Sequence, residues 1–240
     1  MLRLLYRDER VVVIDKPPGL LVHRSQVDRR ETRFAVQLLR DQIGRKVWPV
    51  HRLDRGTSGV LIFALDEEAS GRLGSQFQAG HVTKTYRAIV RGHPPETLVI
   101  DHPLERVDDP YLRFPGAETR PVQNALTRLR RLGVFELDIC VDRYPTSRYA
   151  YVKLNPETGR RHQLRRHLKH IAHPIIGDST YGKGRHNRLF AAHFGADRLL
   201  LACTAISWQH PDDGRPMKTE APVGDSFAAT LALLGWDGDQ

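Results

Sequence analysis

The chain has 240 residues, of which 40% are hydrophobic and 27% charged, as in an ordinary globular protein with a sizeable core. No run of about 20 apolar residues is present, which excludes a helical membrane span, and early charges exclude a signal peptide. Lysine and arginine outnumber aspartate and glutamate, 37 against 28, and this net charge of +9 favours a polyanionic partner. The distant Cys140 and Cys203 predict reduced, buried thiols in a cytoplasmic protein.

Hydrophobic periodicity and turn residues divide the chain into short elements. Alternating or apolar runs predict strands at residues 4–6, 11–15, 60–64, 81–91, 97–103, 134–140, 148–154 and 198–207. Capping residues and helical spacing predict helices at residues 32–43, 66–80, 160–172, 185–194 and 226–234. Asp66 is the expected N-cap of the second of these helices. Residues 124–132 fit a helix or a strand, and the run after Gly133 favours a hairpin around that glycine.

Strands outnumber helices, and most are expected to pair as hairpins. This pattern predicts an α+β fold with a mostly antiparallel mixed sheet flanked by helices and loops. No repeat or long linker divides the sequence. We therefore expect residues 1–240 to form a single domain, with no separate N-terminal binding module.

The segment 51–59, HRLDRGTSG, places Asp54 between an arginine and two hydroxyl residues, directly before the apolar strand 60–64. Polar loops at the end of a buried strand often carry catalytic side chains. A plain β-turn in which Asp54 bonds its own backbone is the alternative. Farther along, alternation in the strand 81–91 places Lys84 and Tyr86 on one face.

The predicted helix 160–172 is strongly basic. A helical projection places Leu164, Leu168 and Ile171 in a buried stripe, with Arg165 at its border. A half-buried guanidinium needs an anionic partner, because an unpaired buried charge costs several kcal/mol, and a structural salt bridge would also satisfy it. The projection assigns the open arc to His162, Arg166, His167, Lys169 and His170.

Signatures of other chemistries are missing from the sequence. The histidines at 167, 170 and 173 do not predict a metal site, because steps of three residues splay them around a helix and their arginine and lysine neighbours repel a cation. No HExxH is present either. No GxGxxG or GxxxxGK[ST] predicts a nucleotide cofactor, and no GxSxG predicts a serine hydrolase. Asp54, Tyr86 and Arg165 therefore remain the best candidates for catalysis by side chains alone.

Four segments in sequence order resemble motifs of the RluA family of pseudouridine synthases. They are KPPG at 16–19, HRLDRGTSG at 51–59, KTY at 84–86, and TGRRHQLR at 158–165 with HPIIGD at 173–178. The resemblance spans nearly the whole chain. It implies the catalytic domain of a pseudouridine synthase, an isomerase that needs no metal or cofactor.

The resemblance also implies roles for individual residues. Asp54 would be the catalytic carboxylate, acting as a nucleophile or as a base, and Arg165 would be its ion-pair partner. Tyr86 would stack on a uracil flipped out of the RNA, and Arg52 would fill the vacated space. The expected RNA contacts are His51, Arg52, Lys84, Arg160, Arg161, His162 and Arg166.

Segments 21–25, 40–44, 144–149 and 193–195 resemble a branch of the family that modifies uridine 65 in the tRNA acceptor stem. Ala202 departs from the family pattern, which often has histidine there, and so leaves fine positioning of the base open. Three alternatives remain: the same reaction at another tRNA or rRNA uridine, a non-catalytic RNA-binding or chaperone protein, and a carboxylate-dependent hydrolase of a small anion. We expect the protein to act as a monomer on RNA, with no membrane partner.

Overall fold

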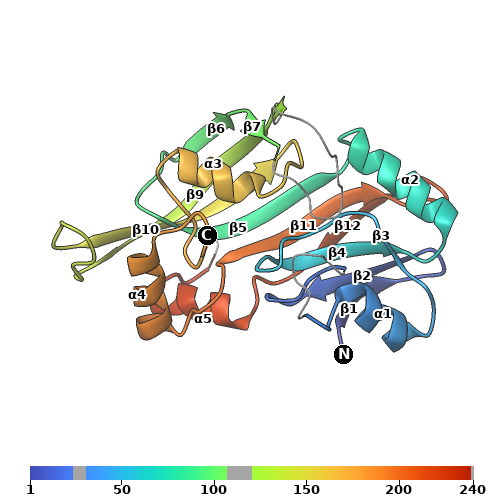
Figure 1. The fold of residues 1–240 in the computed structure, drawn as a ribbon, viewed down its shortest axis with the longest axis horizontal. Helices are drawn as coiled ribbons and strands as arrows, with labels where there is room; N and C mark the ends of the chain where they lie inside the picture. The colour runs from blue at the N-terminus through green and yellow to red at the C-terminus, as the bar shows by residue number, and fades with distance from the viewer. Residues whose placement is uncertain (24–30, 107–120, 239–240) are drawn as a thin grey trace.

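A computed structural model describes residues 1–23, 31–106 and 121–238, and a ten-stranded mixed sheet runs through them (Figure 1). Its strands are β1 (Arg3–Arg7), β2 (Val11–Lys16), β3 (Trp48–Pro49), β4 (Ser58–Ala64), β5 (Thr83–Arg91), β6 (Thr97–Asp101), β9 (Leu126–Leu137), β10 (Ser147–Pro156), β11 (Leu201–Gln209) and β12 (Pro216–Glu220). A separate small sheet pairs β7 (Leu104–Glu105) with β8 (Val122–Gln123). The helices are α1 (Ala35–Ile43), α2 (Glu67–Gln78), α3 (Gln163–His170), α4 (Gly184–Phe194) and α5 (Asp225–Leu233).

The strand order of the large sheet is β1-β2-β4-β11-β5-β10-β9-β6, with β3 beside β4 and β12 beside β11. Every pairing is antiparallel except that of β4 with β11, which is parallel. The predicted α+β class and the mostly antiparallel mixed sheet are therefore confirmed. None of the helices in the described part of the chain is long and apolar enough to cross a bilayer.

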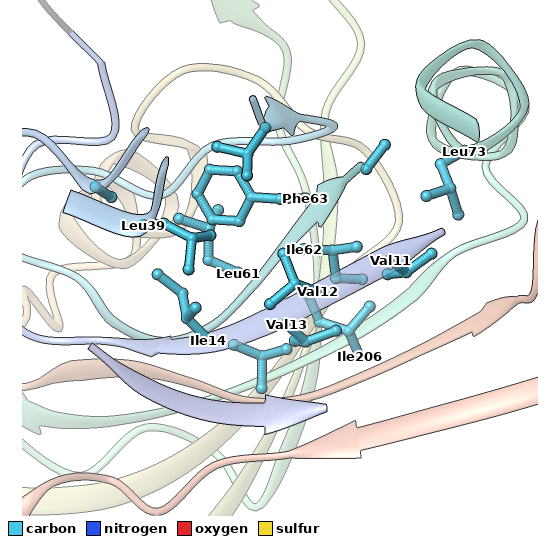
Figure 2. Packing of buried hydrophobic residues seen from close by; sticks show 14 of the residues in the cluster. Val11, Val12, Val13, Ile14, Leu39, Leu61, Ile62, Phe63, Leu73 and Ile206 are labelled. Atoms are coloured by element: carbon cyan, nitrogen blue, oxygen red, sulfur yellow. The ribbon is translucent and has the colours of Figure 1, made fainter. Parts of the chain in front are cut away.

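The N-terminal half of the sheet is buried on both faces. This explains why β2 and β4 read as unbroken apolar runs rather than alternating ones. Figure 2 shows Leu61 and Phe63 near Leu39 of α1, while Leu73 of α2 approaches Val11. Each fully buried aliphatic side chain contributes about 1.5–3 kcal/mol, so this packing fixes the end of β4.

In the C-terminal half, α3 lies on one face of the sheet while α4 and α5 lie on the other (Figure 1). Leu164 and Leu168 of α3 pack with Val152 and its neighbours. Phe190 of α4 and Phe227 of α5 pack in the cluster that contains Tyr151 and other alternate residues of the same strands. The packing of α3 on this face of the sheet therefore fixes where the polar side chains of the helix point.

Two predicted helices are shorter than expected. The first begins at Ala35 rather than Thr32, and Phe34 is its extended N-terminal neighbour. The second, α3, begins at Gln163 rather than Arg160, because His162 has a φ of 54° and its left-handed backbone cannot continue a helix. Arg160 and Arg161 therefore belong to the loop before α3. At its other end the helix stops at His170 rather than at Ala172.

The hairpin expected around Gly133 is wrong. β9 is one continuous strand through this position, and a β-bulge opposite Tyr151 and Val152 lies there instead. The Trp236 ring packs against Gly133, where an added Cβ would lie 2.5 Å from a ring carbon. The glycine therefore admits an aromatic ring rather than a turn. The strand β12 was not predicted, and Cys140 is exposed although Cys203 is buried.

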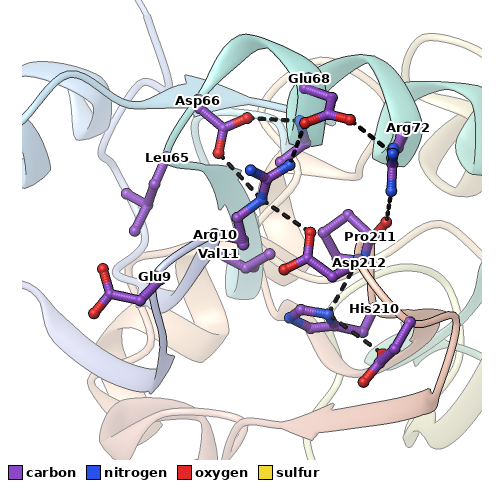
Figure 3. Close-up of polar contacts among 12 residues, drawn as sticks. Glu9, Arg10, Val11, Leu65, Asp66, Glu68, Arg72, His210, Pro211 and Asp212 are labelled. Atoms are coloured by element: carbon purple, nitrogen blue, oxygen red, sulfur yellow. Dashed lines mark hydrogen bonds and ion pairs between the residues drawn. The ribbon is translucent and has the colours of Figure 1, made fainter.

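A charged network ties the β1–β2 turn to α2 and to the turn after β11 (Figure 3). Arg10 pairs with Asp66 at 3.3 Å, with Glu68 at 2.8 Å and with Asp212 at 3.0 Å. Asp66 also caps α2, as predicted, by accepting a hydrogen bond from the backbone N–H of Ala69 at 2.9 Å. Exposed pairs contribute about 0–1 kcal/mol each, so this network serves mainly to align the two turns with the start of α2.

Candidate active site

A cleft of about 460 Å³ opens on the α3 side of the sheet, where several loops meet. The turn after β2, the loop before β4, the start of α3, the turn that ends at Asp178 and the segment before β11 form its walls. The charged and imidazole side chains that line it are Arg52, Asp54, Arg55, Arg161, His162, Arg165, Asp178, Asp197 and Arg198. Arginines dominate this set, so the cleft suits an anionic ligand.

Arg165 lies at the centre of the polar contacts in this cleft. Its Nη1 donates to Oδ2 of Asp54 at 3.2 Å, so α3 and the loop before β4 meet as the family resemblance implies. Its Nε and Nη2 donate to both carboxylate oxygens of Asp178, at 2.7 and 2.9 Å. Arg165 is only 9% exposed, so the predicted demand for an anionic partner is real, and two carboxylates meet it.

Asp178 was missed as a site residue, although it ends the quoted HPIIGD motif. It is 2% exposed, and its Oδ1 also accepts hydrogen bonds from the backbone N–H groups of Thr180 and Tyr181. Burial by itself would raise the pKa of Asp178, but the bonds from Arg165 and the backbone outweigh it and lower that pKa. The carboxylate is therefore held ionised inside the protein.

Two glycines let the backbones around the cleft approach each other. Gly59 has a φ of 109°, and a Cβ there would lie 2.0 Å from the carbonyl oxygen of Cys203. Gly177 has a φ of 79°, and its Cβ would lie 1.8 Å from the carbonyl oxygen of Arg198. A side chain at Gly59 would push β4 away from β11, and one at Gly177 would push its turn away from the segment before β11.

His162 lies on the other side of Asp54. Its Nε2 is 3.8 Å from Oδ1 of Asp54, and its Nδ1 is 3.1 Å from the hydroxyl of Tyr181. Burial lowers the pKa of His162, with Asp54 opposing and Arg165 assisting the change. The imidazole is therefore neutral near pH 7. Its left-handed backbone is the kind of local strain that clusters at functional sites.

Lys16, from the KPPG turn, is fully buried beneath the loop that carries Asp54. Its ammonium group donates to the carbonyl oxygens of Pro17, Leu20 and Arg55, at 2.9, 2.8 and 3.2 Å. Burial lowers the pKa of Lys16 to about 7. The residue ties two motif loops together, a role that its place in a proline- and glycine-rich turn did not reveal.

Tyr86 and Lys84 lie on the same side of β5, as the alternation predicted, next to β11. Tyr86 is half-buried and packs against two hydrophobic clusters, the one that contains β2 and β4 and the one that contains Leu164 and Leu168 of α3. Its hydroxyl forms a hydrogen bond with the thiol of Cys203. Burial and the neighbouring thiol raise the pKa of Tyr86 well above its ordinary value. Its hydroxyl is therefore protonated near neutral pH.

The predicted RNA contacts are not all oriented alike. His51 turns inward: its Nε2 accepts from the backbone N–H of Ile62 at 3.1 Å, and its ring stacks on Phe77. Burial lowers the pKa of His51 to about 3, so the ring is uncharged. Arg160 donates to the carbonyl oxygen of Asn124, and Arg166 to that of Glu105, and neither arginine is among the residues that line the cleft. Arg52 and Arg161 line the cleft itself.

The helical projection misplaced His167, which is fully buried rather than on the open arc. Its ring nitrogens face the hydroxyl of Thr127 and the carbonyl oxygen of His102, both at 3.0 Å. Ala202 is also fully buried, in the cluster under α4 and α5 rather than beside Tyr86. Within the described residues, no group of three or more His, Cys, Asp or Glu side chains is arranged to hold a metal ion.

Comparison with known proteins identifies the family of the chain. Residues 10–170 match the family described as RNA pseudouridylate synthase. The chain is 44% identical to a tRNA pseudouridine synthase C of Vibrio cholerae serotype O1, over 98% of this chain and 97% of the relative. It is 45% identical to the protein of that name from Salmonella typhimurium, over 99% and 92%.

Among solved structures, Human RNA Pseudouridylate Synthase Domain Containing 1 superimposes with a TM-score of 0.70 and 27% identity. The match covers 92% of this chain and 83% of that chain. The chain therefore belongs to the RNA pseudouridylate synthase family, as its RluA-type motifs predict, and is an isomerase.

Proposed function

We propose that the protein converts one uridine of tRNA, uridine 65 of the acceptor stem, into pseudouridine, with Asp54 as the essential carboxylate. The contact between Arg165 and Asp54 carries this proposal, because it brings a buried guanidinium to a carboxylate in a basic cleft. Two relatives that share almost their full length with the chain are named for tRNA. The resemblance of residues 144–149 and 193–195 to the branch that modifies uridine 65 supports the narrower assignment.

The reaction breaks the C1′–N1 bond, turns the uracil and forms a C1′–C5 bond. C5 loses a proton and N1 gains one, so substrate and product are isomers and no electrons are exchanged. A carboxylate can serve as a nucleophile at C1′ or as a base at the sugar. Asp54 fits both roles, since Arg165 holds one of its oxygens and leaves the other toward His162.

A uridine inside a stem must first leave the stack, at a cost of a few kcal/mol. We propose that Arg52 fills the vacated space and that the half-buried ring of Tyr86 stacks on the flipped uracil. The inward ring of His51 supports a role in holding the loop rather than in touching RNA. The remaining proposed RNA contacts are Lys84, Arg160, Arg161, His162 and Arg166.

The same reaction at another tRNA or rRNA uridine is the nearest alternative. A non-catalytic RNA-binding protein would not require the ionised pair of Asp54 and Arg165, and a hydrolase of a small anion would not require RNA. Binding to RNA should weaken steeply as salt rises, through counterion release, whereas binding of a small anion should weaken far less. We expect the enzyme to act as a monomer in the cytoplasm, where tRNA is modified.

Mapping pseudouridine in RNA from a strain that lacks the gene tests the proposed site. We expect the modification to disappear from uridine 65 of tRNA, to return with the wild-type gene and to stay absent with Asp54→Asn. Loss at a different uridine would refute the site while leaving the chemistry intact. Restoration of the modification by Asp54→Asn would refute the role of the carboxylate.

A further inference from the structure

We propose that Asp178 is a positioning residue that occupies most of the Arg165 guanidinium and so leaves Asp54 free to react. The proposal rests on the catalytic role proposed for Asp54. The carboxylate of Asp178 bonds Arg165 and the backbone of Thr180 and Tyr181 rather than Asp54, so it would act on Asp54 only through Arg165.

Asp54 and Asp178 share the guanidinium of Arg165 unequally. Arg165 donates from Nε and Nη2 to the two oxygens of Asp178, at 2.7 and 2.9 Å. This forked arrangement is the strongest geometry available to an arginine and a carboxylate. Asp54 accepts one hydrogen bond, from Nη1, at the longer distance of 3.2 Å. The stronger ion pair of Arg165 is therefore the one with Asp178, and Asp54 accepts a single, longer hydrogen bond.

Asp178 is itself fixed from several directions. Its Oδ1 accepts from the backbone N–H groups of Thr180 and Tyr181, each at 2.9 Å. Its carbonyl oxygen accepts from the side-chain amide of Asn187 at 3.0 Å. Its side chain borders the cleft but is only 1% exposed, and these bonds fix the carboxylate so that it holds Arg165 in one orientation.

The ion pair between Asp178 and Arg165 determines how much positive charge acts on Asp54. Arg165 and Asp178 together are neutral, so Asp54 faces a guanidinium whose charge is largely compensated. Without Asp178, the whole positive charge and the full fork would be available to Asp54. A carboxylate clamped in that way is a weaker nucleophile and a weaker base, because its ionised form is stabilised. Asp178 would thus orient Arg165 and limit its hold on Asp54.

The variant Asp178→Asn tests the proposal, because it removes the charge and keeps the shape. We expect kcat, measured by tritium release from RNA labelled at uridine C5, to fall on the order of 100-fold, the loss that a small misplacement of a reacting group can cause. KM should change little. The acid limb of the pH profile of kcat should move about one to three pH units lower, because the full charge of Arg165 then favours the ionised form of Asp54.

A purely structural role predicts something else. Asp178→Asn would then lower the melting temperature and the folded fraction, and the remaining activity would keep the wild-type pH profile. That result would overturn the proposal. Asp101→Asn, at an exposed aspartate on β6 outside the cleft, is the matched control and should leave both kcat and the pH profile unchanged.

Two further variants keep the test decisive if Asp178→Asn fails to fold. Asp178→Glu retains the charge and should keep the acid limb at the wild-type pH, with a kcat above that of Asp178→Asn. A shifted limb in that variant would contradict the proposal. Asp54→Asn separates the two claims: if it remains active, the proposed role of Asp54 fails, whatever Asp178→Asn does. If it is inactive while Asp178→Asn keeps the wild-type profile, only the role of Asp178 fails.

Discussion

Nη1 of Arg165 lies 3.2 Å from Oδ2 of Asp54, although 111 positions separate the two residues in sequence. The contact joins the helix on one side of the cleft to the loop on the other. It forms because Leu164 and Leu168 hold α3 on the sheet while the buried strand β4 holds the end of the loop. Packing of two separate cores thus brings the ion pair together.

Replacement of Arg165 by alanine should abolish turnover and destabilise the protein. The change leaves Asp178 buried without its counter-charge, which typically costs about 3–5 kcal/mol. Thermal or urea denaturation should show this loss, and tritium release should fall to the background rate. Arg40→Ala, at an exposed arginine paired with Asp41, is the matched control and should change stability by no more than about 0.5 kcal/mol.

The double variant Arg165→Ala, Asp178→Ala separates stability from catalysis. Removal of both charges should recover part of the lost stability, because no buried charge is left unpaired. Turnover should stay at background, because Asp54 still lacks its partner. Unchanged turnover in Arg165→Ala itself would mean that the ion pair has no catalytic role.

Variants of Tyr86 should distinguish its ring from its hydroxyl. Tyr86→Phe keeps the aromatic surface and should bind RNA as tightly as the wild type. Tyr86→Ala removes the stacking surface and should weaken binding by about 1–3 kcal/mol. Filter binding or fluorescence anisotropy measures both. Equal affinities in the two variants would contradict a stacking role, and kcat of Tyr86→Phe would then report whether the hydroxyl moves a proton.

The lowered pKa of Lys16 leads us to expect an unusual dependence of the free energy of unfolding on pH. Burial lowers its pKa to about 7, whereas an unfolded lysine titrates near 10.4. Between these values the unfolded state binds the extra proton, so the free energy of unfolding should rise with pH from about 7 to about 10. The contribution should be on the order of a few kcal/mol. Urea denaturation across this range measures it.

Lys16→Met should lack that rise, whereas Lys46→Met, at an exposed lysine, should keep it. The same rise in Lys16→Met would show that another group is responsible. Turnover of Lys16→Met should also fall, because the carbonyl oxygen of Arg55 loses its bond to the KPPG turn. The loop that presents Asp54 would then be held less firmly.

The sequence predicted the elements whose signals are local. The cap at Asp66, the hairpin of β1 and β2, and the shared side of Lys84 and Tyr86 follow from capping chemistry and from periods of two residues. The charge of Arg165 at the border of a buried stripe even required a partner before any contact was known. The family motifs then indicated Asp54 as that partner.

Features that depend on distant packing were not predictable. The helical projection could not show that Asp178 takes the larger share of Arg165, because the competition depends on the geometry of a separate loop. Gly133 resembled a turn because its need for space comes from Trp236, about 100 positions later. The residue pattern predicted that the helix begins at Arg160, but it begins at Gln163 because the backbone of His162 is left-handed.

The most direct test of the account is tritium release from tRNA labelled with [5-³H]uridine, compared between the wild type and Asp54→Asn. The wild type should release tritium as C5 gives up its proton. Asp54→Asn should release none above background, while its melting temperature and its affinity for tRNA stay close to those of the wild type. Release by Asp54→Asn at a rate near that of the wild type would contradict the central claim that Asp54 carries the reaction.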